Sequence, residues 1–294
     1  MNPREHRQRS RQRGFSLVEL LVAFVISMLL LTGVIQVFFA SKQTYASNEA
    51  ASRLQENGRF ALEFIAQSAR HAGYVQPDNN ADKPSPIAKP GDISCDSNNN
   101  EDDACSNDGD NAAADIWERS DRTSFIFQPR LGADDKRRDC NGNEIANNNA
   151  LILNQFFIAP PSAITPPYDP TLHPPLTLNC RSLIFNSNSK GAFIGVQSPL
   201  IEGIDALQIQ YGLSEKSSDL NNVSQYISAE RVTALNKWSN VTAIRIAVLA
   251  NSVERTNPPT PARAYVLLDA APIVIDDGRA RQVFTTTIKL RNNF

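Results

Sequence analysis

Glu19 is the residue most open to a chemical role, because it stands at the edge of a long apolar run. Residues 20–40 contain no Asp, Glu, Lys or Arg, and about twenty apolar residues suffice to span a bilayer as a helix. A carboxylate within such a span costs up to about 2.5–3.5 kcal/mol at the centre and less near the interface. Glu19 is therefore a candidate functional residue.

A second interpretation of Glu19 is purely structural. Ser16 and Glu19 have the spacing of a capping box, with Ser16 as the N-cap and Glu19 at the third helical position. A helix cap of this kind contributes on the order of 1 kcal/mol. The residue pattern by itself leaves both interpretations open.

A basic segment precedes the apolar run. Residues 1–13 carry five arginines and one acid, Glu5. Because positive charge is retained on the cytoplasmic side of a membrane, we expect the N-terminus in the cytoplasm and everything after Ala40 on the other side. The pattern predicts a single-pass membrane protein with an exported body.

Gly14 and Phe15 lie between the basic segment and the helix. The order basic leader, Gly14, Phe15, then an acid at Glu19 resembles the class III signal of type IV pilins and type II secretion pseudopilins. The resemblance implies that a prepilin peptidase cuts after Gly14 and methylates the new amine of Phe15. That cation would lie about one helical turn from Glu19, and a neighbouring subunit's amine could compensate the carboxylate during assembly.

The apolar run continues into an amphipathic segment at 41–73, so that residues 1–14, 15–40 and 41–73 form leader, membrane helix and head helix. The expected buried positions recur at helical spacing: Leu54, Ala61, Ile65, Ala69 and Ala72. The opposite face carries Glu56, Arg59, Glu63 and Arg70, with i,i+4 pairs expected for Glu49–Arg53 and Arg59–Glu63. Gly73 is a suitable C-cap.

Two further stretches narrow the resemblance. Residues 55–61 and 70–74, with the C-terminal stretch 283–292, are similar to the PilW family of minor pilins. That implies a non-enzymatic subunit that helps to prime or cap a type IV pilus, supporting twitching motility and adhesion. The implied partners are other minor pilins, the major pilin, prepilin peptidase, inner-membrane lipid and a pilus-tip adhesin. A minor pseudopilin of type II secretion is the alternative.

Four cysteines, Cys95, Cys105, Cys140 and Cys180, lie in the part expected outside the membrane, where disulfides persist. Four cysteines allow three pairings; we favour neighbours in sequence, Cys95 with Cys105 and Cys140 with Cys180. No C-x-x-C occurs, which argues against a zinc site.

Residues 74–122 are rich in Asn and Asp, and we expect a surface loop there. Calcium binding by an EF-hand is excluded by spacing, because the first ligand position would be Ala104 or Arg137. An irregular oxygen-ligand site stays open beside the simpler solvated loop.

Residues 123–294 should form a β-rich head. Short stretches rich in β-branched and aromatic residues predict strands at 124–128, 150–158, 178–185, 206–211, 241–250, 264–268 and 283–290. A short helix is expected at 229–237. The fold class is α+β, with the long N-terminal helix packed on a C-terminal antiparallel sheet.

No catalytic motif or cofactor fingerprint is present, so we expect neither enzyme activity nor a cofactor nor a metal. The histidines, His6, His71 and His173, are expected to be ordinary surface residues. The net charge of -2 gives no basic footprint for nucleic acid. A membrane-anchored ligand-binding or hydrolytic domain is a third reading, and it would require a deep polar pocket.

Overall fold

The computed structural model describes residues 14–76, 84–89, 105–113, 115–132, 134, 136–146, 150–161, 167–185, 193–215 and 222–292. The chain divides into two compact units, Met1–Asn48 and Glu49–Phe294. The second unit is called the head.

Helix α1 (Leu17–His71) is 55 residues long. It starts directly after Ser16 and stops just before Gly73, whose φ of +75° ends the helix in a conformation that glycine adopts without strain. The predicted start and end are confirmed within two residues.

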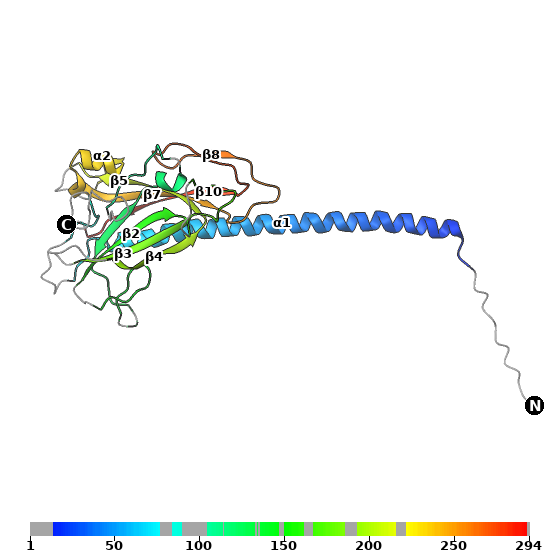
Figure 1. Ribbon diagram of the computed structural model, residues 1–294, viewed down its shortest axis with the longest axis horizontal. Helices are drawn as coiled ribbons and strands as arrows, with labels where there is room; N and C mark the ends of the chain where they lie inside the picture. The colour runs from blue at the N-terminus through cyan, green and yellow to red at the C-terminus, as the bar shows by residue number, and fades with distance from the viewer. Residues whose placement is uncertain are drawn as a thin grey trace, which may run out of the picture. The chain divides into compact units, whose positions relative to one another are not determined.

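The rest of the head is built from antiparallel strands (Figure 1). One sheet has the order β1 (Thr123–Phe127), β2 (Leu151–Ala159), β3 (Thr177–Phe185) and β4 (Phe193–Glu202). A second sheet has the order β10 (Arg281–Lys289), β7 (Val241–Asn251), β5 (Ile204–Leu213) and β6 (Gln225–Ile227). The hairpin of β8 (Arg263–Tyr265) and β9 (Ile273–Ile275) stands apart from both.

Three short helices connect these strands. They are the 3-10 turn η1 (Ile116–Arg119), the helix α2 (Ala229–Ala234) and the 3-10 turn η2 (Trp238–Asn240). The helix expected at 229–237 is therefore present but shorter.

The head part of α1 packs against both larger sheets. All five positions expected to be buried, Leu54, Ala61, Ile65, Ala69 and Ala72, are at most 6% exposed. Polar groups fix the helix to the first sheet: Asn57 Nδ2 donates to Glu202 O at 2.9 Å, and Asn154 Nδ2 on β2 donates to Ser68 Oγ at 3.4 Å. The α+β class, with a long helix and antiparallel sheets, is confirmed.

All seven predicted strands are present, and β4, β6 and β9 were not predicted. Pro199 in β4 weakens a strand signal, because proline cannot donate to the ladder and is tolerated only at edges or bulges. The strands β6 and β9 have three residues each, too few for an alternating pattern to register.

The prediction of a surface loop at 74–122 is wrong for part of the described segment. Ile87 and Ala88 are at most 2% exposed, and Ile87 bridges to Phe125 beside β1. Asp121 is only 4% exposed. Its buried carboxylate is satisfied by hydrogen bonds that it accepts from Gly109 N at 2.9 Å and Ile209 N at 2.7 Å. Amino-acid composition alone cannot distinguish a buried carboxylate that accepts main-chain hydrogen bonds from an acid in a solvated loop.

Candidate assembly site

The residues predicted for processing lie at the N-terminal end of α1. Gly14 and Phe15 precede the helix, and Phe15 is 84% exposed. Glu19 lies in the first turn, four residues after Phe15. The carboxylate therefore lies at the positive end of the helix dipole, close to the place where cleavage would create an amine.

The capping interpretation of Glu19 receives little support from the geometry. Leu20 N donates to Ser16 O at 3.2 Å, a main-chain contact. Among the residues described from Gly14 onward, neither the Ser16 hydroxyl nor the Glu19 carboxylate takes part in a side-chain hydrogen bond. The Glu19 carboxylate is thus available to a group from outside the chain.

The first part of α1 displays an apolar surface. The helix is long and apolar enough to cross a membrane, and its most apolar window is fully exposed. Between Leu17 and Phe39, seventeen large apolar side chains are exposed, on the order of what one membrane span requires.

In the head, Gly58 marks a close approach between α1 and the last strand. A Cβ at Gly58 would overlap the aromatic ring of Phe284 on β10. Gly58 belongs to the stretch 55–61 and Phe284 to the stretch 283–292, so the two ends of the sequence resemblance meet at one contact. Only glycine leaves the ring enough room here.

The C-terminal end of α1 meets the same C-terminal stretch. Asn292 Nδ2 donates to Ala72 O at 3.1 Å and to His71 O at 3.5 Å. These carbonyls belong to the end of the helix and lack helical donors. A Cβ at Gly73 would lie 2.8 Å from Asn292 O. The side chain of Asn292 therefore caps the helix.

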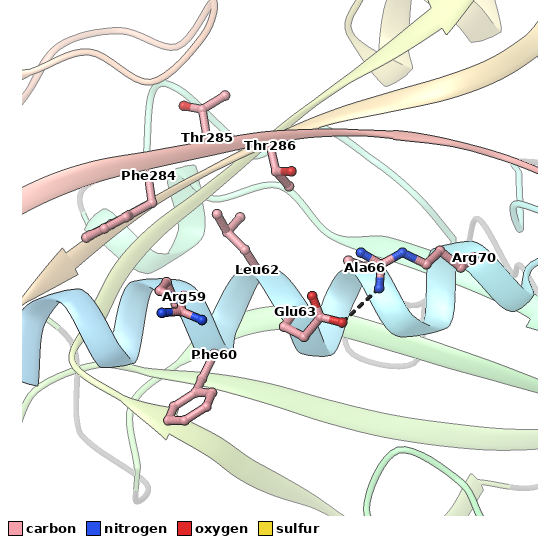
Figure 2. A pocket seen from close by; sticks show the side chains of 9 residues that line it. All are labelled: Arg59, Phe60, Leu62, Glu63, Ala66, Arg70, Phe284, Thr285 and Thr286. Carbon is pink, nitrogen blue, oxygen red and sulfur yellow. Dashed lines mark hydrogen bonds and ion pairs between the residues drawn. The ribbon is translucent and has the colours of Figure 1, made fainter.

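A groove of about 470 Å³ lies between α1 and β10 in the head. Figure 2 shows Leu62, Phe284 and Thr286 facing one another, while Glu63 and Arg70 lie along the helix. Glu63 pairs with Arg70 at 2.8 Å, so the predicted Arg59–Glu63 pair is wrong, whereas the predicted Glu49–Arg53 pair is present at 2.9 Å. A residue seven positions away reaches Glu63 because both side chains extend along the open helix face.

The disulfide Cys140–Cys180 is present, with a Cα–Cα distance of 6.3 Å. It joins the loop before β2 to strand β3, and this predicted pairing is confirmed. Cys95 lies outside the described residues, and with it the predicted pair Cys95–Cys105. His6 also lies outside them.

A buried network of ion pairs at the start of β10 was not predicted from the sequence. Arg281 donates from Nε to Asp205 at 2.7 Å and from both terminal nitrogens to Asp277 at 2.6 Å. Asn251 Nδ2 also donates to Asp205 at 2.8 Å. Burial would raise the pKa of Asp277, but hydrogen bonds from Arg281 and from the main chain of Arg279 hold that pKa below its ordinary value. No spacing rule links Asp205 to Arg281, so only the fold reveals the pair.

Two described acids of the polar loops, Asp139 and Asp108, accept hydrogen bonds from the main chain. Asp139 accepts from Asn141 N and Asn143 N, each at 2.8 Å, and Asp108 accepts from Ala229 N and Glu230 N at the start of α2. Within the described ranges no group of three or more His, Cys, Asp or Glu is arranged to hold a metal ion.

The remaining histidines have structural surroundings. His71 is half-buried beside Phe127, and its pKa is lowered by burial and by the charges of Arg130 and Arg70. His173 Nδ1 accepts from Asp169 N at 2.9 Å. Neither is placed against a nucleophile.

Comparisons with known proteins agree with the two ends of the chain. Residues 175–292 match the family model of PilW, the type IV pilus-assembly protein W, and residues 9–35 match the prokaryotic N-terminal methylation motif. Among solved structures, a type IV-like pilin from Thermus thermophilus is 11% identical, with a TM-score of 0.44; the match covers 82% of this chain and 97% of that one. No curated protein matches the sequence.

The PilW match covers β10 and Asn292, and the methylation motif covers Gly14, Phe15 and Glu19. Both therefore include the residues whose geometry is described above. The chain is therefore similar to PilW-type type IV pilins over residues 175–292, and its methylation motif is followed by a helix long and apolar enough to cross a membrane.

Proposed function

We propose that this chain is a minor pilin, a structural, non-enzymatic subunit that enters a type IV pilus through α1 and helps to prime or cap its assembly. Twitching motility and adhesion would depend on it. Before assembly, the chain would cross the inner membrane once, with the leader 1–14 in the cytoplasm and the head in the periplasm.

The observation that carries the proposal is the position of Glu19. It is an acid with no hydrogen-bond or ion-pair partner among the described residues, in the first turn of α1 and directly before the uncharged stretch 20–40. Cleavage after Gly14 would place a cationic amine on Phe15, and the methylation motif spans both residues. An ion pair between Glu19 and the amine of an adjacent subunit offsets the cost of a carboxylate in lipid.

Such a pair also specifies geometry. It can form only when two helices are offset along the membrane normal so that one N-terminus meets the first turn of the next. It therefore favours one stagger between subunits. The partners in this step are other minor pilins and the major pilin, after prepilin peptidase has acted; a pilus-tip adhesin would join later.

The test replaces Glu19 by Gln in the native host and measures the chain in sheared pili and in the membrane. Glu19→Gln keeps the size of the side chain and one acceptor oxygen but removes the charge. We expect membrane levels to stay normal and the amount in pili to fall about tenfold or more, since 1.4 kcal/mol corresponds to a factor of ten.

The matched control is Glu49→Gln, which makes the same chemical change in an exposed pair with Arg53 outside the apolar run. Exposed pairs contribute little, so this variant should assemble normally. Wild-type incorporation of Glu19→Gln would refute the ion-pair role.

A deletion strain separates pilus assembly from type II secretion. The PilW match at 175–292 favours the pilus, so surface pili and twitching should be lost while protein export continues. Loss of export with intact pili would assign the chain to the secretion system instead.

A further inference from the structure

The two larger sheets of the described head end in four edge strands, β1, β4, β6 and β10. An edge strand presents unpaired N–H and C=O groups that can pair with another chain, and proteins usually protect such edges by short length, bulges, proline or a covering segment. The four edges differ sharply in this respect.

Three edges carry such protection. The segment around Ile87 covers β1, with Ile126 N donating to Pro86 O at 3.1 Å. Strand β4 has two register shifts against β3 and contains Pro199. Strand β6 is only three residues long.

Strand β10 is protected by neither short length nor a bulge nor proline, and α1 lies beside it across the groove. Its nine residues pair with β7 in one unbroken register, from Arg281 opposite Asn251 to Lys289 opposite Ala243. It contains no proline, and the exposed side chains along it include the β-branched Thr285 and Thr287. No described strand or isolated bridge pairs with its other edge. The edge is therefore a regular template for a further strand.

The groove described above runs along this free edge. Its lining includes Phe284, Thr285 and Thr286 but none of the β7 residues paired with them, so it lies on the side of β10 away from β7. Its other wall is α1 (Figure 2). A strand added to β10 would turn every second side chain toward this groove.

The net positive charge of the residues that line the groove indicates which kind of segment would bind there. Glu63 and Arg70 neutralise each other, whereas Arg59 is exposed and has no ion pair among the described residues. A second copy of this chain would bring the same excess positive charge to the shared seam. A segment with a carboxylate opposite Arg59 would instead gain an ion pair.

We propose that the free edge of β10 binds an extended, carboxylate-bearing segment of another protein by strand addition. Main-chain hydrogen bonds along β10 give the affinity, and the pairing with Arg59 selects acidic segments. This surface belongs to the head and is independent of the proposed Glu19 ion pair.

A defined peptide tests the proposal on the full-length chain in detergent micelles. The probe is a fluorescent nine-residue peptide of alternating Thr and Val with one central Glu. We expect saturable binding by anisotropy, together with slower amide hydrogen exchange confined to 281–289. A peptide with proline next to the central Glu should bind much more weakly, since proline interrupts the ladder.

Two charge variants test the selectivity. Arg59→Glu should weaken binding of the Glu peptide about fivefold or more, because an attraction becomes a repulsion, and should favour a peptide with Lys in place of Glu. Arg231→Glu, an equally exposed change on α2, should have no effect.

Several outcomes would overturn the proposal. They are the absence of saturable binding, equal binding of the proline peptide, or equal affinity of the Arg59→Glu variant for both charged peptides. Protection of 281–289 that rises with protein concentration in the absence of peptide would show a second copy at the edge and refute the acidic occupant. None of these results bears on Glu19 or on cleavage after Gly14.

Discussion

At the level of single residues, two glycines allow the C-terminal stretch to pack closely against α1. Gly58 lets the Phe284 ring lie against α1, and Gly73 lets Asn292 cap the end of α1. Both contacts join a residue of the helix to one more than 200 positions later. These glycines are needed for close approach and, at Gly73, for a positive φ.

Replacing Gly58 by Ala tests this close approach. Because the new methyl group overlaps the Phe284 ring, we expect the head to lose about 1–3 kcal/mol of unfolding free energy. Urea unfolding of the full-length chain in micelles, followed by the fluorescence of Trp117 and Trp238, measures this loss.

Gly33→Ala is the control for helix propensity. A Cβ at Gly33 meets nothing within 4 Å, so this change should leave the unfolding of the head unaltered. Adding Phe284→Val to the Gly58→Ala variant should restore part of the lost stability. Equal stability of the Gly58→Ala variant and the wild type would contradict the packing described here.

At the level of elements, the position of β10 depends on the buried network around Arg281. The side chain of Arg281 is 2% exposed and those of Asp277 and Asp205 are at most 3% exposed. The network fixes the beginning of β10 to the start of β5, where Arg281 donates to Asp205. Through Asn251, which also donates to Asp205, it fixes both to the end of β7. The edge and the groove are thereby held in place.

Asp277→Asn should destabilise the head by about 3 kcal/mol or more, because removing one member of a buried pair leaves the other charge uncompensated. The control is Asp134→Asn, which breaks a pair of the same spacing and length, with Arg138 at 2.6 Å, on the exposed surface. Little change is expected there. A similar, small effect of both changes in urea unfolding would refute the network's role.

The same network has a pH signature. The pKa of Asp277 in the folded protein is lowered from the ordinary value of 3.8. The ionised carboxylate therefore contributes fully to the free energy of unfolding above pH 3.8, and this contribution is lost as the pH falls through the lower pKa of the folded state. The Asp277→Asn head should lack this part of the acid destabilisation. An unchanged acid limb in the variant would contradict the assignment.

Much of this element plan could be predicted from the sequence, because helical spacing marked the buried face of α1 and β-branched and aromatic residues marked seven strands. In and just after the last of these strands, Phe284, Ile288 and Leu290 contact the core. The pattern could not reveal β6 and β9, which are too short, or the pairing of Asp205 with Arg281, which depends on tertiary proximity. Asp121 falls in the predicted surface loop 74–122, because composition does not show that its carboxylate has main-chain partners.

The candidate site divides in the same way. Gly14, Phe15 and Glu19 could be recognised because their order is local in sequence. The groove beside β10 could not, because its walls come from residues 59–70 and 284–286. Local chemistry is visible in the sequence, whereas a surface formed by distant segments requires the fold.

At the level of the whole molecule, the chain combines a unit Met1–Asn48, which contains the apolar part of α1, with a folded head, Glu49–Phe294. In the proposed role, the first supplies entry into the pilus and the second supplies binding surfaces such as the β10 edge. The first function requires that the basic leader be removed, since an attached leader would leave no amine on Phe15.

Mass spectrometry of the protein recovered from sheared pili tests this central claim most directly. We predict an N-terminal peptide that begins at Phe15 and carries one added methyl group. Recovery of the chain in pili with the arginine-rich residues 1–14 still attached would contradict the account.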